Sequence, residues 1–239
     1  MNLPEFIGLD IGYSSVKMAQ VTFVSENHPK LIAIGQTEIE KPINLLKDEN
    51  EKKALAFKIK TLRESLGIKT NKVVVALPES MIFSTIIAVP DLPEDQLEKI
   101  IYYEAKNHLP IPVDDVNLDH IPITKKMVEG KGIQQILMIA APKNIISLYM
   151  EILGMAGLEV LALETESLAT ARTMTYKGDL NNGAVVMDFG SRGSAVAVIK
   201  GKNIIYSQNI NSGSDSLTQA IARDYNIDFR QAEQYKISY

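Results

Sequence analysis

Two short segments of this sequence combine an acidic residue, a glycine and small polar residues in a way that suits phosphate chemistry. The first runs from Asp10 through Gly12 to Lys17, and the second runs from Asp188 through Gly190 to Ser194. An aspartate at a strand end can hold a divalent cation through water, and glycine lets backbone N–H groups approach an anion closely. Both segments are therefore candidate phosphate sites, although each one alone also fits an ordinary β-turn.

The side chains around both turns add donors of the same kind. Lys17 would project beside the first turn, where it can reach a terminal phosphate. Hydroxyl groups come from Ser14, Ser15, Ser191 and Ser194. The two segments share one order of residue types: an apolar run, an aspartate, an apolar residue, a glycine, a polar turn and a strand. Asp188 follows Asp10 at an offset of 178 residues. This offset is too long for a solenoid and predicts two similar half-folds that face each other.

Other kinds of active site find little support in the sequence. The nucleotide motifs G-x-x-x-x-G-K-[ST] and G-x-G-x-x-G do not occur, nor does the nucleophile elbow G-x-S-x-G. The residues His28, His108 and His120 lack the spacing of metal ligands, and His108 near a helix end suits capping or packing.

Composition excludes several further classes of protein. The 239 residues include no cysteine, which excludes a disulfide scaffold, thiolate zinc sites and cysteine nucleophiles. A net charge of −4 and a pI near 5.5 argue against a nucleic-acid binder. No apolar run reaches the roughly 20 residues that cross a membrane, and the N-terminus lacks the pattern of a signal peptide. We therefore expect a cytoplasmic protein with no direct membrane insertion.

Hydrophobic periodicity predicts the elements that must position the two segments. The first part should contain strands over 7–11, 16–21 and 30–38, a helix over 48–66 and a buried strand over 72–77. A small α+β module over 80–163 should follow, with strands over 83–89, 116–125, 133–140 and 158–163 and helices over 94–109 and 143–156. The rest should contain helices over 164–174, 217–225 and 230–239, the second hairpin over 183–199 and a strand over 202–210. The last helical pattern has no stop signal, so we expect a fragment of a longer protein.

The segment from Gly8 to Lys17 resembles the first phosphate motif of the actin-like ATPase superfamily, and the segment 187–194 resembles the second. Three further segments, 103–110, 163–169 and 212–236, are most similar to the PilM family of type IV pilus assembly proteins, and next to the FtsA family of cell-division proteins. The resemblance covers essentially the whole chain. It implies an α/β fold of the actin-like (ribonuclease-H-like) type, with two lobes and an inserted small α+β (SHS2-like) subdomain.

The resemblance also implies a division of the chain and a cofactor. The first lobe would comprise 1–79 and 164–180, the inserted subdomain 80–163, and an incomplete second lobe 181–239. The cofactors would be ATP and Mg²⁺, with Asp10 and Asp188 organising the metal and Glu166 orienting water. The phosphates would be held by Gly12, Ser14, Ser15, Lys17, Gly190, Ser191, Gly193 and Gly213.

Two departures from the family pattern affect this site. The stretch 211–214 has one glycine, Gly213, where the family often has two, so the backbone would approach a ligand less closely there. The glycine motif that contacts adenosine lies further toward the C-terminus in this superfamily, and this chain stops before it.

The implied function is a scaffold held at the inner face of the cytoplasmic membrane through a partner. That partner would be the N-terminal cytoplasmic peptide of the inner-membrane pilus protein PilN, bound in a groove between the first lobe and the module. Self-association is a further possibility. The alternatives are an FtsA-like filament protein of cell division and an ATP-hydrolysing enzyme of the same fold.

Overall fold

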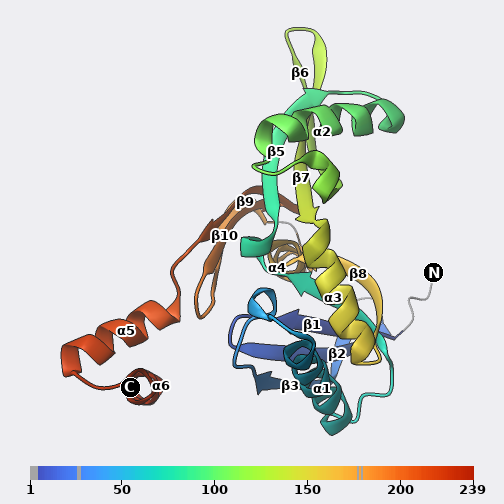
Figure 1. Ribbon diagram of the computed structural model, residues 1–239. Coiled ribbons are helices and arrows are strands. Elements are labelled where there is room, and N and C mark those ends of the chain that lie inside the picture. Colours follow the sequence, from blue (N-terminus) through green and yellow to red (C-terminus); the bar gives the residue numbers. More distant parts are fainter. Residues whose placement is uncertain (1–4, 26–27, 177, 179) are drawn as a thin grey trace.

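The computed structural model describes the chain except residues 1–4, 26–27, 177 and 179. These omitted residues fall within the expected ranges 1–79 and 164–180, so those parts of the two ranges lie outside the described residues. Three separate sheets organise the fold (Figure 1). No helix in the described part of the chain is both long and apolar enough to cross a bilayer.

The first sheet has the strand order β3-β2-β1-β4-β8. Its strands are β1 (Ile7–Ile11), β2 (Ser15–Ser25), β3 (His28–Glu38), β4 (Lys72–Leu77) and β8 (Glu159–Thr165). Strands β1, β2 and β3 pair antiparallel, whereas β4 lies parallel to both β1 and β8. The helices α1 (Glu49–Ser65) and α3 (Lys143–Met155) and the short 3-10 helix η1 (Ile43–Leu45) accompany this sheet.

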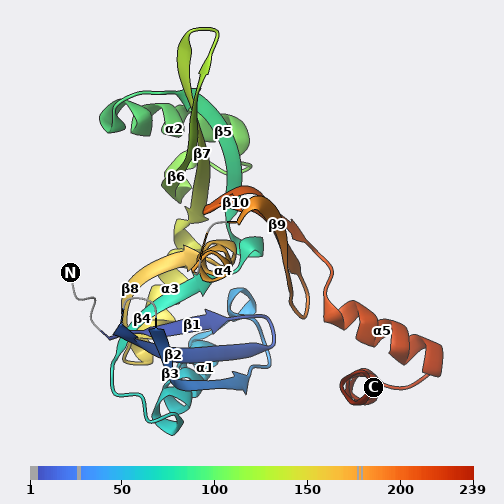
Figure 2. The ribbon, with the colours of Figure 1, turned by 180° about the vertical axis from the view of Figure 1, so that it is seen from behind.

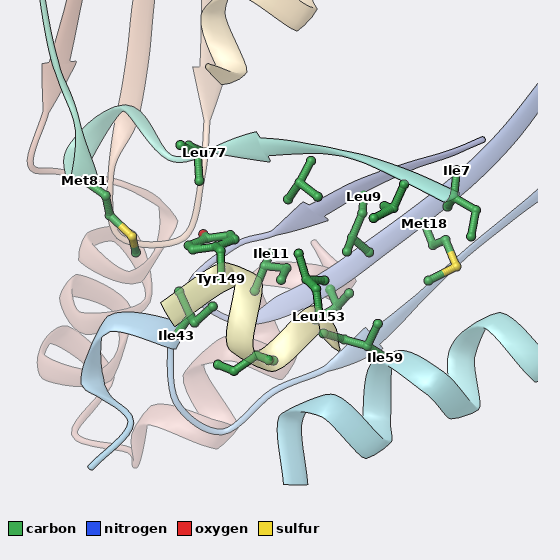
Figure 3. Close-up of a cluster of buried hydrophobic side chains, with 14 of the residues drawn as sticks. Ile7, Leu9, Ile11, Met18, Ile43, Ile59, Leu77, Met81, Tyr149 and Leu153 are labelled. Carbon is green, nitrogen blue, oxygen red and sulfur yellow. The ribbon is translucent and has the colours of Figure 1, made fainter. Parts of the chain in front are cut away.

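The main hydrophobic core lies between this sheet and the two helices (Figure 3). Alternate residues of β1 point into it, so that Ile7 and Ile11 are fully buried and Leu9 is 3% exposed. From α3, the core receives Tyr149, Ile152 and Leu153, all fully buried. This packing fixes β1, and with it the position of Asp10 at its end.

The second sheet, β5-β7-β6, projects from the rest of the molecule as an inserted module (Figures 1 and 2). It contains β5 (Phe83–Pro90), α2 (Glu94–His108), β6 (Val116–Val128) and β7 (Lys131–Pro142), with the 3-10 helices η2 (Glu79–Met81) and η3 (Val113–Asp115). A smaller core joins α2 to β5 and β7, where Leu97, Ile101 and Ala105 are buried.

The expected end of the module at residue 163 does not coincide with the sheet boundary. Strand β8 pairs with β4 in the first sheet, where Lys72 lies opposite Glu159, and α3 packs in the core of that sheet. Both elements were expected in the module because the strands and helices over 80–163 together fit one small α+β unit. Their buried faces instead complete the first core.

The third sheet, β11-β10-β9, contains the second hairpin. Its strands are β9 (Leu180–Phe189), β10 (Ser194–Gly201) and β11 (Asn203–Ile210). The helices α5 (Ser214–Tyr225) and α6 (Phe229–Ser238) follow, and both views show them extending away from the three sheets (Figures 1 and 2). Helix α5 begins three residues before the expected residue 217.

Helix α4 (Glu166–Met174) lies between the first and third sheets, where it contacts β4 and β8 of the first and β10 and β11 of the third. The expected helix began at residue 164, but Glu164 and Thr165 still belong to β8. The side chain of Thr165 accepts a hydrogen bond from the backbone N–H of Leu168 at 3.2 Å and caps the helix. This cap makes Glu166 the first residue of α4.

Candidate functional site

The two sequence segments form hairpins with the same backbone geometry. In the first, Asp10 on β1 lies opposite Lys17 on β2, and the backbone N–H of Gly12 donates to the carbonyl of Ser15 at 3.0 Å. In the second, Asp188 on β9 lies opposite Ala195 on β10. There the N–H of Gly190 donates to the carbonyl of Gly193, also at 3.0 Å. The predicted strand, turn and strand pattern is therefore confirmed for both segments.

Both hairpins border one cavity of about 90 Å³. Ten of the residues predicted for the site line it, and of the candidates only Gly213 and Ser194 are not among its described lining residues: the ten are Asp10, Gly12, Ser14, Ser15, Lys17, Glu166, Asp188, Gly190, Ser191 and Gly193. The repeat that the sequence shows at an offset of 178 residues thus brings two matched aspartates to a common space.

Gly213 has a different position, behind the second turn. A Cβ atom at Gly213 would lie 2.4 Å from the carbonyl oxygen of Gly190 and 2.6 Å from that of Ser191. The backbone N–H groups of Ser214 and Asp215 donate to these same two carbonyls, at 3.0 and 2.8 Å. Gly213 is therefore required where two backbone segments approach closely, and it supports the turn from outside the cavity.

Ser194 was a wrong candidate as a free hydroxyl donor. Its side chain is buried, and its Oγ donates to the carbonyl of Ser212 at 2.7 Å. Position 194 follows the turn and matches the apolar Val16 of the first hairpin, which is fully buried. The hydroxyl thus contributes to the contact with the chain before α5.

The geometry of Asp10 fits a cation and a phosphate. Its Oδ2 accepts from the Lys17 ammonium group at 3.1 Å, whereas its Oδ1 is buried without a hydrogen-bond partner among the described residues. An unpartnered buried carboxylate oxygen is costly unless a ligand satisfies it. Partial burial opposes the charge on Lys17, yet the nearby Asp10 carboxylate raises the pKa of Lys17 above its ordinary value.

The second turn closes tightly on itself beside the cavity. A Cβ atom at Gly190 would lie 2.8 Å from the carbonyl oxygen of Gly193, so this position requires glycine. Within the described residues, no group of three or more His, Asp and Glu side chains is arranged to hold a metal ion alone. Mg²⁺ bound to a nucleotide commonly uses one or two carboxylates together with phosphates and water. The pair Asp10 and Asp188 therefore fits Mg²⁺ with a nucleotide.

Glu166 is the acid whose protonation differs most from that of a free side chain. Burial, and next the negative charge of Asp10, raise the pKa of Glu166 from 4.5 to about 7. Asp188 and Glu79 add to the effect, while a hydrogen bond from the backbone N–H of Glu79, at 3.4 Å, opposes it. Near neutral pH this carboxyl can thus hold or release a proton.

Glu79 lines the same cavity, although the sequence motifs did not point to it. It is only 8% exposed, and its Oε1 accepts from the backbone N–H of Ser167 at 3.2 Å in the first turn of α4. Its Oε2 accepts from the hydroxyl of Ser84 on β5 at 3.5 Å. Glu79 therefore ties the start of the module to the helix that carries Glu166. The signal that could have identified Glu79 from the sequence is an acidic residue just beyond a buried parallel strand.

Residues beside the turns connect the two hairpins. The hydroxyls of Tyr13, in the first turn, and Ser80 form a hydrogen bond at 3.1 Å. The guanidinium of Arg192, in the second turn, lies 5.9 Å from the centre of the Tyr13 ring. Arg192 also pairs with Asp215 of α5, with 3.4 Å between Nε and Oδ2.

Two further cavities lie where the module meets the third sheet and α4. One of about 280 Å³ lies between β5, β7, the end of α2 and β11, and its apolar lining residues are Ile82, Phe83, Leu109 and Met138. The other, of about 220 Å³, lies between β6, α4 and the turn before β11. The side-chain amide of Asn203 donates to the carbonyl of Ile123 at 2.9 Å in this second region.

Comparison with known proteins identifies relatives along nearly the whole chain. A family model described as "Type IV pilus assembly protein PilM" matches residues 8–239. A chain of the solved "PilM-PilN type IV pilus biogenesis complex" is 27% identical, with a TM-score of 0.87 over 99% of this chain and 70% of that chain. The cytoplasmic domain of EpsL from Vibrio cholerae, with a TM-score of 0.57 and 15% identity over 94% of this chain and 78% of that chain, shares the fold.

The curated relatives include cell division proteins. FtsA of Enterococcus hirae is 24% identical over 98% of this chain and 57% of its own length. FtsA of Enterococcus faecalis is 23% identical over 98% of this chain and 58% of its own length. This chain therefore spans little more than half the length of these relatives. With the family match over 8–239, these comparisons confirm the expected α/β fold, and the chain belongs to the PilM family of type IV pilus assembly proteins, within the actin-like ATPase superfamily.

Proposed function

We propose that the chain is the nucleotide-binding part of a pilus assembly scaffold that holds Mg²⁺ and ATP between its two hairpins. The observation that carries this proposal is the pair of matched hairpins, whose aspartates Asp10 and Asp188 line one cavity. In the proposed division, the five-stranded sheet forms the first lobe, the sheet of β5, β6 and β7 with α2 forms the inserted subdomain, and β9 onward begins the second lobe.

Each hairpin has a separate part in binding. Asp10 and Asp188 would hold the metal, which neutralises phosphate charge when bound. The first turn would bind phosphates through Gly12, Ser14, Ser15 and Lys17, and the second through Gly190, Ser191 and Gly193. Gly213 keeps the second turn in place, and Glu166 would orient a water molecule in the cavity.

The test is calorimetric titration of the full-length protein with ATP and Mg²⁺. Replacing Asp10→Ala or Lys17→Ala removes a charge-assisted contact, so we expect a loss of about 1.5–3 kcal/mol in binding free energy. Lys30→Ala, at an exposed position on β3 of the same sheet, is the matched control and should bind as wild type. Unchanged affinity in both site variants would show that the first hairpin is only a turn.

The proposed partner is the cytoplasmic N-terminal peptide of PilN, which would place the protein at the inner face of the membrane. The solved relative is a complex of PilM with PilN. The expected groove lay between the first lobe and the module. A cavity at the base of the module supports a peptide site there. It is lined by Ile82 and Phe83, which follow η2, and also by β11 of the third sheet.

Peptides of this kind bind through a few buried apolar anchors, so the affinity should depend little on salt. We expect Phe83→Ser to weaken binding of a fluorescent PilN peptide at least tenfold. Phe57→Ser is the control, since Phe57 on α1 is already 69% exposed. Equal peptide affinity for wild type and Phe83→Ser would reject this site.

Two alternatives are separated by simple measurements. The similarity to FtsA favours a filament-forming protein. A filament would sediment as polymer in the presence of ATP. Self-association would be detected in the same sedimentation experiment. An ATP-hydrolysing enzyme would release phosphate from ATP, and the Glu166→Gln variant would abolish this release.

A further inference from the structure

Arg192 occupies the middle of the second turn, and the predicted site did not include it. Its two neighbours, Ser191 and Gly193, both line the cavity. Its guanidinium reaches across to Tyr13, which lies in the turn of the opposite hairpin. Arg192 is therefore a cation that spans the two hairpins beside the cavity.

The present contacts of Arg192 hold it loosely. The pair with Asp215 is 3.4 Å long, which exceeds the 2.7–2.9 Å typical of a strong charge-assisted hydrogen bond. The Arg192 side chain is 53% exposed, and exposed ion pairs contribute little because water and salt screen them. An exposed cation–π contact such as that with Tyr13 is similarly weak. A more highly charged anion can replace both partners.

The charges around the cavity call for another cation. The acids that line it are Asp10, Glu79, Glu166 and Asp188, whereas Lys17 is the only basic residue among the described lining residues. Lys17 already pairs with Asp10. A polyphosphate in this cavity would therefore meet more negative than positive charge, even with one divalent cation.

The strand register shows that the two hairpins provide cations in different ways. In the first hairpin the cation, Lys17, lies directly opposite the aspartate. In the second hairpin the corresponding residue is Ala195, which carries no charge. The basic residue of the second hairpin is Arg192 in the turn itself. Its planar guanidinium can bind two phosphate oxygens with two parallel hydrogen bonds in a fixed geometry, whereas the Lys17 ammonium acts as a point charge.

We propose that Arg192 is a specificity-determining residue that exchanges Asp215 for the terminal phosphate of a nucleoside triphosphate. This inference rests on the proposed function, because it needs a nucleotide in the cavity. A terminal phosphate carries more charge than a bridging one and offers more free oxygens to a guanidinium. Because a diphosphate lacks this third phosphate, Arg192 makes the site prefer the triphosphate over the diphosphate and draws the two hairpins together through a shared anion.

The experiment measures the affinities of the full-length protein for ATP and ADP, each with Mg²⁺, by calorimetry. We expect Arg192→Ala to lower the ratio of ATP to ADP affinity about tenfold and Arg192→Lys to lower it less. Asp215→Asn removes the competing carboxylate and should raise ATP affinity severalfold. Arg223→Ala is the matched control, because Arg223 on α5 has a side chain that is 79% exposed and pairs with Asp224.

The possible results separate this inference from the proposed function. A wild-type protein that binds neither nucleotide refutes the proposed function and the role of Arg192 together. A wild-type protein that binds ATP, with the same ATP to ADP ratio in Arg192→Ala, overturns only the role of Arg192. An equal loss of both affinities in Arg192→Ala also overturns it, since a general electrostatic or structural effect does not discriminate the two nucleotides. The melting temperature without nucleotide, measured for each variant, identifies any structural effect.

Discussion

Glu166 allows a quantitative test of the electrostatics of the site. Burial, followed by the charge of Asp10, raises its pKa from 4.5 to about 7. Each pKa unit corresponds to about 1.4 kcal/mol, so the shift is equivalent to at most about 3.5 kcal/mol of folding free energy. The folded protein binds this proton more tightly than the unfolded chain does. The contribution to stability is therefore complete below pH 4.5 and is lost as the pH rises through about 7.

The perturbation is Glu166→Gln, which keeps the shape of the side chain and removes its titration. The free energy of unfolding of both proteins is measured by urea denaturation at closely spaced pH values from acid to mildly alkaline. We expect the difference, wild type minus variant, to fall by about 2–3 kcal/mol between pH 4.5 and about pH 7 and to be constant on either side. Glu98→Gln, at an exposed position on α2, controls for the loss of one negative charge.

A difference that stays constant across this pH range would refute the reasoning, because a raised pKa must appear as a slope. A second variant tests the assigned cause. Asp10→Asn removes the strongest charge acting on Glu166, so the fall in stability should move to lower pH. If the fall keeps its position, the contribution assigned to Asp10 is wrong.

Two further predictions concern packing, and both are measured by urea denaturation. Gly213→Ala should lose about 1–3 kcal/mol of stability, because the new Cβ would lie 2.4 Å from the carbonyl oxygen of Gly190. Gly154→Ala in α3 should instead gain up to about 1 kcal/mol, because the new Cβ would meet no described atom within 4 Å apart from its neighbours in the helix. Similar effects of the two changes would contradict the proposed crowding at Gly213. Tyr149→Phe should gain about 1 kcal/mol, because the buried Tyr149 hydroxyl has no hydrogen-bond partner among the described residues. A loss of stability would show that this hydroxyl is bonded.

The sequence predicted those features of the site that depend on local pattern. The hairpins that carry Asp10 and Asp188 follow from alternating apolar residues around Gly and Ser turns, and their register matches the 178-residue repeat. Features that depend on distant contacts were not predictable in this way. The backbone N–H of Ser167 meets Glu79 from 88 positions away, and Arg192 meets Tyr13 across two sheets.

The prediction that α3 and β8 belong to the inserted module was wrong for a related reason. Their apolar residues fit the core of a module as well as the core of the first sheet, and periodicity cannot choose between two cores. The choice depends on the parallel pairing of β8 with β4 and on the burial of Tyr149 beside β1. Likewise, the end of β8 is fixed by the Thr165 cap, which the apolar spacing of the helix did not indicate.

The insertion of the module between β4 and β8 has a consequence for folding kinetics. These strands are neighbours in the sheet, yet the whole module separates them along the chain. Closing a long flexible loop costs entropy that grows with the logarithm of its length. A folded module shortens this loop, because pairing of β5 with β7 sets Phe83 opposite Ala140 and so brings the two ends of the module together.

We therefore expect the module to fold first and to bring β8 within reach of β4, so that the first sheet closes last. Pulsed hydrogen exchange during refolding should protect the amides of β7 before those of β8. Protection of β8 before β7 would contradict this order. The inserted sheet would then also set the rate at which the first sheet forms.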